Sequence, residues 1–187
     1  CLFTHLNAGG SAVYLVNNKN PAIVREMLKE YDWNISSYEK KGKCIFLDCY
    51  SGLMSMSSRD SRNIKIPTDL KEVMSSIIET VSSLNSNVML VFDSLSSLID
   101  VTNSEEDAIQ FIKSLKEELA ARKVTLVALF THWPYEDRTI HEIKELFDCV
   151  INLKAIEQKV ILRSYFSIDK AGWLPELERK EIPYKVI

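Results

Sequence analysis

The segment at residues 88–99 constrains the fold more than any other part of the sequence. It begins with five apolar residues, Val88 to Phe92, and turns polar at Asp93 and Ser94. An uninterrupted apolar run of this length is typical of a strand that is buried on both faces of a parallel sheet. Open α/β sheets bind their ligands outside the carboxyl ends of the strands. We therefore expect Asp93 and Ser94 at a ligand-binding edge.

Two interpretations of Asp93 are open at this point. In P-loop NTPases, an aspartate at the end of such a strand holds Mg²⁺, either directly or through water. A buried strand whose aspartate only caps the following turn gives the same pattern. The first interpretation makes Asp93 a metal ligand and the second makes it a structural residue, and the segment alone does not separate them.

The composition is that of an ordinary globular protein. The chain has 187 residues, 46% hydrophobic and 26% charged, so it is long and apolar enough to bury a two-sided core. With 23 basic and 26 acidic residues the formal net charge is −3, which argues against nucleic acid or an anionic membrane as a partner. No apolar run approaches the ~20 residues that span a bilayer. The four cysteines show no CxxC spacing and are expected as free thiols in a reducing cytoplasm.

Four apolar runs alternate with amphipathic segments, a pattern that predicts a three-layer α/β domain. The runs are expected to form neighbouring, buried, parallel strands with helices on both faces, at residues 12–16, 44–48, 88–92 and 124–130. The helices are expected at residues 1–8, 20–31, 35–41, 68–85, 103–119 and 140–147. Residues 51–69 show no pattern, and both a flexible loop and a binding loop fit them.

The pattern changes after the last of these helices. Apolar residues at 149–153 and 160–162 flank a polar stretch at 157–159, which predicts an antiparallel hairpin. Residues 165–168 extend its second arm, and residues 183–187 are predicted as a final edge strand. We expect these antiparallel strands to close one edge of the parallel sheet, and residues 1–187 to form a single domain.

Several segments match one protein family in order and spacing. They are a strand (13–16), a helix (21–28), a tryptophan element (31–33), a Lys-Gly-Lys step (41–43), a strand that ends in Asp-Cys-Tyr-Ser (46–51), the acid-ended segment (91–98) and a further strand (126–132). Together they resemble the RecA-like domains of KaiC-type proteins, a group widespread in archaea and named for a cyanobacterial clock ATPase. The similarity covers most of residues 1–170. It implies a RecA-like fold, ATP or ADP with Mg²⁺ as cofactors, and a homo-oligomer or a related RecA-like chain as partner.

The chain departs from the family pattern in three places. Residues 1–8 read as the end of a helix without a cap, so the family's phosphate-binding loop is expected upstream of Cys1. The resemblance implies an acidic pair, the general base for hydrolysis, where this chain has Asn17 and Asn18. An amide does not accept a proton at neutral pH, so a base at these positions is lost. The family's terminal Lys-Met-Arg-Gly motif is not recognisable, and Lys170 is its nearest remnant.

Four residues remain as candidate nucleotide contacts. The resemblance implies that Asp93 holds Mg²⁺ and that Ser94, Thr131 and His132 stand with it at the nucleotide-facing ends of two strands. A polar residue after the second of these strands commonly senses the γ-phosphate in related folds. A capped loop histidine is the alternative interpretation of His132.

The resemblance also predicts an additional strand beside residues 88–92. In RecA-like sheets the P-loop strand lies beside this one. If residues 1–187 were the whole protein, residues 88–92 would therefore leave a long apolar edge open to water, which is an aggregation hazard. We expect a strand from upstream sequence or from a partner chain to cover that edge.

Three functions follow from these observations. The first is a degenerate KaiC-like domain with a regulatory or scaffolding role and weak or absent ATP hydrolysis. The second is a functional KaiC-like ATPase whose P-loop lies upstream of Cys1. The third is a RecA-type accessory protein of DNA recombination, against which the acidic balance of the chain argues.

Overall fold

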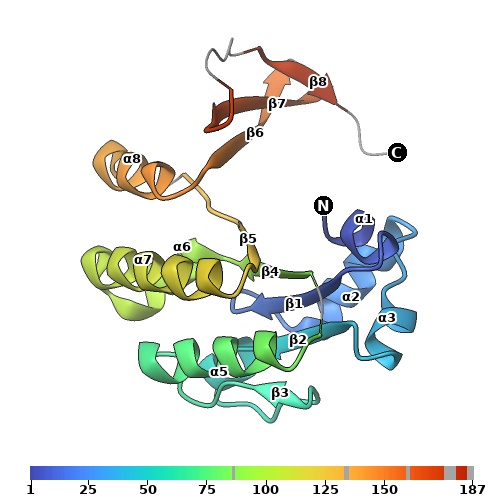
Figure 1. Cartoon of the computed structure of the whole chain (residues 1–187). Coiled ribbons are helices and arrows are strands. Elements are labelled where there is room, and N and C mark those ends of the chain that lie inside the picture. Colours follow the sequence, from blue (N-terminus) through green and yellow to red (C-terminus); the bar gives the residue numbers. More distant parts are fainter. Residues whose placement is uncertain (86, 133–134, 159–160, 175–179, 185–187) are drawn as a thin grey trace. The chain divides into compact units, whose positions relative to one another are not determined.

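The structure, a computed structural model, describes residues 1–85, 87–132, 135–158, 161–174 and 180–184 (Figure 1). The chain divides into two compact units, residues 1–134 and residues 135–187. The first unit is an α/β domain built on a parallel sheet, and the second combines a helix with an antiparallel sheet. The prediction of an α/β fold with a mostly parallel central sheet and antiparallel C-terminal strands is confirmed. The expectation of a single domain stays a prediction.

The parallel sheet of the first unit has five strands in the order β3-β2-β1-β4-β5. Their bounds are Ser11–Val16 for β1, Cys44–Asp48 for β2, Arg62–Asn63 for β3, Val88–Asp93 for β4 and Thr125–Ala128 for β5. All neighbouring pairs are parallel, so the four predicted strands are confirmed as neighbours. The two-residue strand β3 was not predicted, because it lies in the segment at 51–69 that carries no hydrophobic pattern.

The position of β4 in the sheet corrects one expectation. β4 lies between β1 and β5 and pairs with both, so it has no open edge that an extra strand must cover. Among the described strands, β3 and β5 are at the edges of this sheet. β5 is accordingly shorter than the predicted run at residues 124–130, and its side chains are only half-buried or exposed.

The core is split between the two faces of the sheet, because successive side chains of a strand point to opposite faces. One face carries Ala12, Tyr14 and Val16 of β1, which lie in a cluster with Leu6 of helix α1 (Leu2–Asn7) and Val24 of helix α2 (Pro21–Glu30). Helix α3 (Ser36–Lys40) adjoins β2. Helices α5 (Leu70–Ser82) and α7 (Glu105–Ala121) adjoin β1, β2 and β5. In Figure 1 α1, α2 and α3 gather to the right of these strands, and α5, α6 (Leu95–Thr102) and α7 gather to the left.

Several helices of this unit begin at side-chain caps. Asn20 Oδ1 accepts from the backbone N–H of Ala22 at 2.9 Å and begins α2, as predicted from the Asn-Pro pair. Ser104 begins α7 in the same way, through the backbone N–H of Asp107 at 3.1 Å. Two further helices were not predicted: α4 (Tyr50–Leu53) and α6 (Leu95–Thr102), which follows β4 directly and is capped by Ser94.

The second unit begins with helix α8 (Asp137–Glu145) and continues into three antiparallel strands. The strands are β6 (Cys149–Gln158), β7 (Ile161–Ala171) and β8 (Ile182–Tyr184), in the order β6-β7-β8. The predicted hairpin is confirmed, but these strands pair in a sheet of their own instead of closing an edge of the parallel sheet. The polar turn was predicted at 157–159, but Glu157 and Gln158 belong to β6. Residue 159 and the end of the last predicted strand at 185–187 lie outside the described residues. None of the helices in the described part of the chain is both long and apolar enough to cross a membrane.

Candidate functional site

The carboxyl ends of three parallel strands meet at one edge of the sheet. Val16, the last residue of β1, lies opposite Asp48 of β2 on one side and opposite Asp93 of β4 on the other. The next two residues of the chain are Asn17 and Asn18. The structure thus brings Asp93 together with Asn17 and Asn18, which the sequence singled out. Open α/β sheets bind their ligands at this edge.

Asp93 lies buried at this edge, with 6% of its surface exposed, and both of its carboxylate oxygens accept hydrogen bonds. The Tyr14 hydroxyl donates to Oδ2 at 2.9 Å, and Nδ2 of Asn18 donates to Oδ1 at 2.6 Å. Burial raises the pKa of the Tyr14 hydroxyl well above its usual value, and the charge and the hydrogen bond of Asp93 raise it further. Tyr14 therefore remains a protonated donor at physiological pH.

Asn17 is buried and pairs with the backbone of Ser94 through both ends of its amide. Nδ2 of Asn17 donates to the carbonyl oxygen of Ser94 at 3.0 Å, and Oδ1 accepts from the Ser94 N–H at 2.6 Å. The backbone N–H of Asn17 also donates to the carbonyl oxygen of Asp93 at 3.0 Å. Only an amide offers a donor and an acceptor side by side, whereas a carboxylate accepts only. This geometry explains an asparagine at position 17 in physical terms.

The loop after β5 is tied to the start of α6. The Thr131 N–H donates to the hydroxyl of Ser96 at 2.7 Å, and the Leu95 N–H donates to the carbonyl oxygen of Leu129 at 2.9 Å. Thr131 therefore lies close to the segment that follows Asp93, and its role as a nucleotide contact stays a prediction. His132 is exposed, and its ring lies 6.4 Å from that of Phe130.

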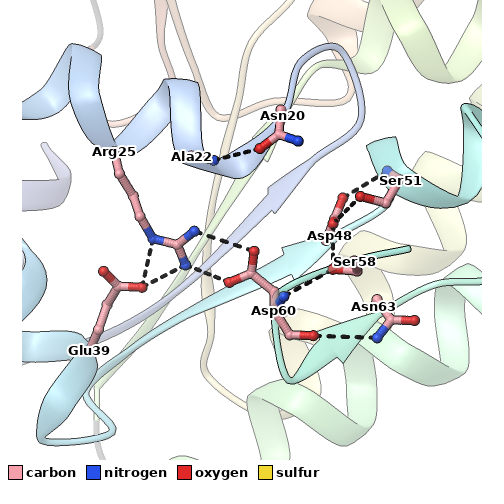
Figure 2. A network of polar contacts seen from close by, with 9 residues as sticks. All are labelled: Asn20, Ala22, Arg25, Glu39, Asp48, Ser51, Ser58, Asp60 and Asn63. Atoms are coloured by element: carbon pink, nitrogen blue, oxygen red, sulfur yellow. Dashed lines mark hydrogen bonds and ion pairs between the residues drawn. The ribbon is translucent and has the colours of Figure 1, made fainter. Parts of the chain in front are cut away.

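Asp48, the acid at the end of β2, is used for local structure (Figure 2). Its Oδ1 accepts from the backbone N–H of Ser51 at 2.9 Å, and its Oδ2 accepts from the hydroxyls of Ser51 and Ser58 at 2.6 Å each. Only 1% of Asp48 is exposed. The carboxylate is thus closed off from any ligand at the edge of the sheet.

A half-buried ion cluster of Arg25, Glu39 and Asp60 continues this network. The Arg25 guanidinium pairs with Glu39 at 2.7 Å and with Asp60 at 2.5 Å (Figure 2). It also lies 4.0 Å from the centre of the Phe46 ring. Burial lowers the pKa of Arg25, but the hydrogen bonds and charges of Asp60 and Glu39 more than offset this and hold the pKa above its usual value. The Asp60 N–H also donates to the Ser58 hydroxyl at 3.0 Å. The segment at 51–69, for which the sequence left a flexible and a binding loop open, is held to α2 and α3 by these contacts.

The parallel sheet with Asp93 at the end of β4 is the arrangement of a RecA-like α/β domain. The chain belongs to the KaiC family of ATPases, because the family model described as "ATPase: KaiC" matches residues 2–187.

Comparison with curated proteins finds distant archaeal relatives. UPF0273 protein SSO1861 of Saccharolobus solfataricus is 26% identical over 98 residues, which are 52% of this chain and 35% of that protein. UPF0273 protein PH0284 of Pyrococcus horikoshii is 24% identical over 127 residues, which are 67% of this chain and 50% of that protein. The chain thus spans between a third and a half of the length of these relatives.

Two solved structures share the fold. The KaiC-like protein PH0186 of Pyrococcus horikoshii superposes with a TM-score of 0.73 at 20% identity, over 97% of this chain and 75% of that one. Protein PH0321 of the same species, solved in complex with an unknown peptide, also gives a TM-score of 0.73, at 9% identity over 98% of this chain and 84% of that one. At these identities the two structures show the fold alone.

Membership of an ATPase family raises the question of whether the residues present fit Mg²⁺. Among the described residues no group of three or more His, Cys, Asp or Glu side chains is arranged to hold a metal ion. Asp93 supplies one carboxylate, and Tyr14 and Asn18 already donate to its two oxygens. A bound Mg²⁺ needs near-ideal octahedral oxygen ligands and takes them from free carboxylates, phosphates and water. The arrangement around Asp93 does not fit direct coordination.

Proposed function

We propose that this chain is a KaiC-family domain with a regulatory or scaffolding role, in which ATP hydrolysis is weak or absent. One observation carries the proposal: Asn17 and Asn18 stand where the family resemblance places an acidic pair, and both amides are engaged with Asp93 and Ser94. A general base has to accept a proton from the attacking water, which an amide does not do at neutral pH.

The neighbouring acids offer no replacement base. Asp48 is buried and accepts three hydrogen bonds from Ser51 and Ser58. Asp93 is buried and accepts hydrogen bonds at both oxygens. A catalytic base must come within hydrogen-bond reach of the proton it removes, and both carboxylates are buried with every oxygen already accepting at least one hydrogen bond.

The proposal includes a ligand, a partner and a compartment. ATP or ADP with Mg²⁺ is the proposed ligand, with Ser94, Thr131 and His132 facing its phosphates at the carboxyl edge. A second copy of this chain or a related RecA-like chain is the proposed partner. A cytoplasmic location is proposed because the cysteines, including the buried Cys44 and Cys49, are free thiols.

Nucleotide affinity and phosphate release, measured on the full-length natural protein, test the proposal. General-base assistance typically contributes ~10²–10⁴-fold in rate, so we expect turnover lower by about this factor than in a family member that carries the acidic pair. Such a family member, assayed in parallel, is the matched control. Turnover at the speed of that control would refute the proposal.

A functional KaiC-family ATPase is the second candidate, and the position of Asp93 at the end of β4 favours it. In this alternative the phosphate-binding loop lies upstream of Cys1 and the water is activated by a group outside the edge formed by β1, β2 and β4. The same assay separates the two candidates, because only the functional ATPase releases phosphate at the speed of the control.

A further inference from the structure

The contacts of Asp93 point to a role that differs from metal binding. Its carboxylate is held between two donors, the Tyr14 hydroxyl on Oδ2 and the Asn18 amide on Oδ1, and both donors come from β1 or the loop directly after it. We propose that the Asn18 amide occupies the place of a cation on Asp93, so that Asp93 joins β4 to β1 without a metal. This inference rests on the proposed function in taking this edge as the nucleotide edge of the domain.

The side chain at position 18 determines whether Asp93 needs a cation. The Asn18 nitrogen lies 2.6 Å from the Asp93 carboxylate oxygen. With a carboxylate in place of that amide, two acidic oxygens would face each other at about this distance, and like charges so close require a shared proton or a cation between them. The amide removes the requirement, because it donates a hydrogen bond to the carboxylate and carries no charge of its own.

The surroundings hold Asp93 in this arrangement. Tyr14 keeps its proton at physiological pH, because burial and the adjacent carboxylate raise its pKa. Asn17 fixes both polar groups of the Ser94 backbone, directly after Asp93. Asp93 therefore has a donor on each oxygen, little exposed surface and a fixed backbone beside it, so a cation that binds directly competes with Tyr14 and Asn18 for the carboxylate.

A titration with Mn²⁺ alone, followed by electron paramagnetic resonance on the full-length protein without nucleotide, tests the inference. We expect Asp93→Asn to leave the Mn²⁺ binding of the protein unchanged, because Asp93 is not a ligand. We expect Asn18→Asp to add a site at least about tenfold tighter than any in the unaltered protein, because it creates a carboxylate pair. Asn34→Asp is the matched control: it adds the same charge in a loop where Asn34 Oδ1 accepts from Ser36, a contact that an aspartate retains.

Thermal unfolding with and without Mg²⁺ gives a second readout. Mg²⁺ is expected to raise the Tm of the Asn18→Asp variant and to leave the Tm of the unaltered protein and of Asn34→Asp unchanged. Loss of Mn²⁺ binding in Asp93→Asn would overturn the inference, whether or not the Asn18→Asp variant folds. An Asn18→Asp variant that folds and gains no site would also overturn it. Neither experiment uses nucleotide, so fast phosphate release would refute the proposed function and leave this result standing.

Discussion

The side-chain amide of Asn17 pairs with both backbone polar groups of Ser94, although the two residues lie 77 positions apart in the sequence. This pairing continues the backbone ladder of β1 and β4 beyond the last strand residues, Val16 and Asp93. It uses the donor and the acceptor of the amide at once. The identity of residue 17 is therefore set by the fold, because only an amide serves both polar groups of the Ser94 backbone.

Asn17→Asp is expected to destabilise the protein. The substitution keeps the shape of the side chain but removes the donor to the Ser94 carbonyl, and an unsatisfied buried group costs about 1–3 kcal/mol. Urea unfolding at neutral pH measures the loss, with Asn34→Asp as a control that changes the charge equally at an exposed cap. Equal stability of the two variants would show that the pairing with Ser94 contributes nothing.

Tyr14→Phe is expected to lower the free energy of unfolding by about 1.5–3 kcal/mol, because it removes a buried hydrogen bond to a charged group. Tyr38→Phe is the matched control, since it removes an exposed hydrogen bond from a tyrosine hydroxyl to Asn7, and its effect is expected to stay within about 0.5 kcal/mol. Urea denaturation of both variants provides the comparison. The prediction is wrong if the two losses are the same.

The strands were predictable from the sequence because their chemistry is local. The runs at residues 12–16, 44–48 and 88–92 are apolar on both faces and end at polar residues, and each one forms a strand within one residue of those bounds. The strand predicted at 124–130 is longer than β5, which covers Thr125–Ala128. β5 has only one neighbouring strand among those described, and its side chains are half-buried or exposed. Strand order was not predictable in the same way, because hydrophobicity indicates burial but not the neighbour, and β4 was wrongly expected to need an extra one.

The candidate site was predictable only in part. Asp93 and the asparagines were found because they follow apolar runs, and the structure brings them together. Tyr14 was read as part of its strand's apolar run, and its contact with Asp93 depends on the register between β1 and β4. One signal pointed to it: a buried tyrosine hydroxyl usually finds a polar partner. The hydrogen bond from Ser58 to Asp48 was not predictable, because Ser58 lies ten positions away in a segment without a hydrophobic pattern.

Stability is expected to fall as the pH rises above about 9, because of two buried thiols. Burial raises the pKa of Cys44 and of Cys49 from 9.0 to about 12, with smaller contributions from nearby acids. Both thiols stay protonated in the folded protein between these values, while the unfolded chain loses the protons. The stabilisation is therefore fully present below pH 9 and is lost as the pH rises towards 12, by at most about 1.4 kcal/mol per pH unit for each thiol.

Urea unfolding at several pH values between 8 and 10.5 checks this dependence. The Cys44→Ala variant is expected to show a shallower decline than the unaltered protein, whatever its stability at pH 8. Cys1→Ala is the control, because Cys1 is exposed and its substitution is expected to leave the slope unchanged. Parallel slopes for all three proteins would contradict the assignment to the buried thiols.

Arg25→Lys is expected to destabilise the protein by about 1–3 kcal/mol, because lysine does not reproduce the planar, branched contacts of the guanidinium with Glu39 and Asp60. Trypsin cleavage after Arg59 and Arg62 is expected to become faster, since Asp60 ties this segment to α2. Arg138→Lys is the control: its partner Glu142 lies one helical turn away on the surface, where such pairs contribute about 0–1 kcal/mol. Unchanged cleavage in the Arg25 variant would show that the segment is held by other contacts.

The last prediction compares an acid at each of the two asparagine positions. Asn18→Glu is expected to raise phosphate release by the full-length protein, because it restores a carboxylate without touching the Ser94 backbone. General-base assistance sets the upper limit of the gain at ~10²–10⁴-fold. Asn17→Glu is expected to give no gain and to destabilise the fold, since Nδ2 of Asn17 donates to the Ser94 carbonyl and glutamate has no such donor. Phosphate release and urea unfolding, measured on both variants, separate these effects, and a gain from Asn17→Glu with unchanged stability would show that residue 17 is the position of the base.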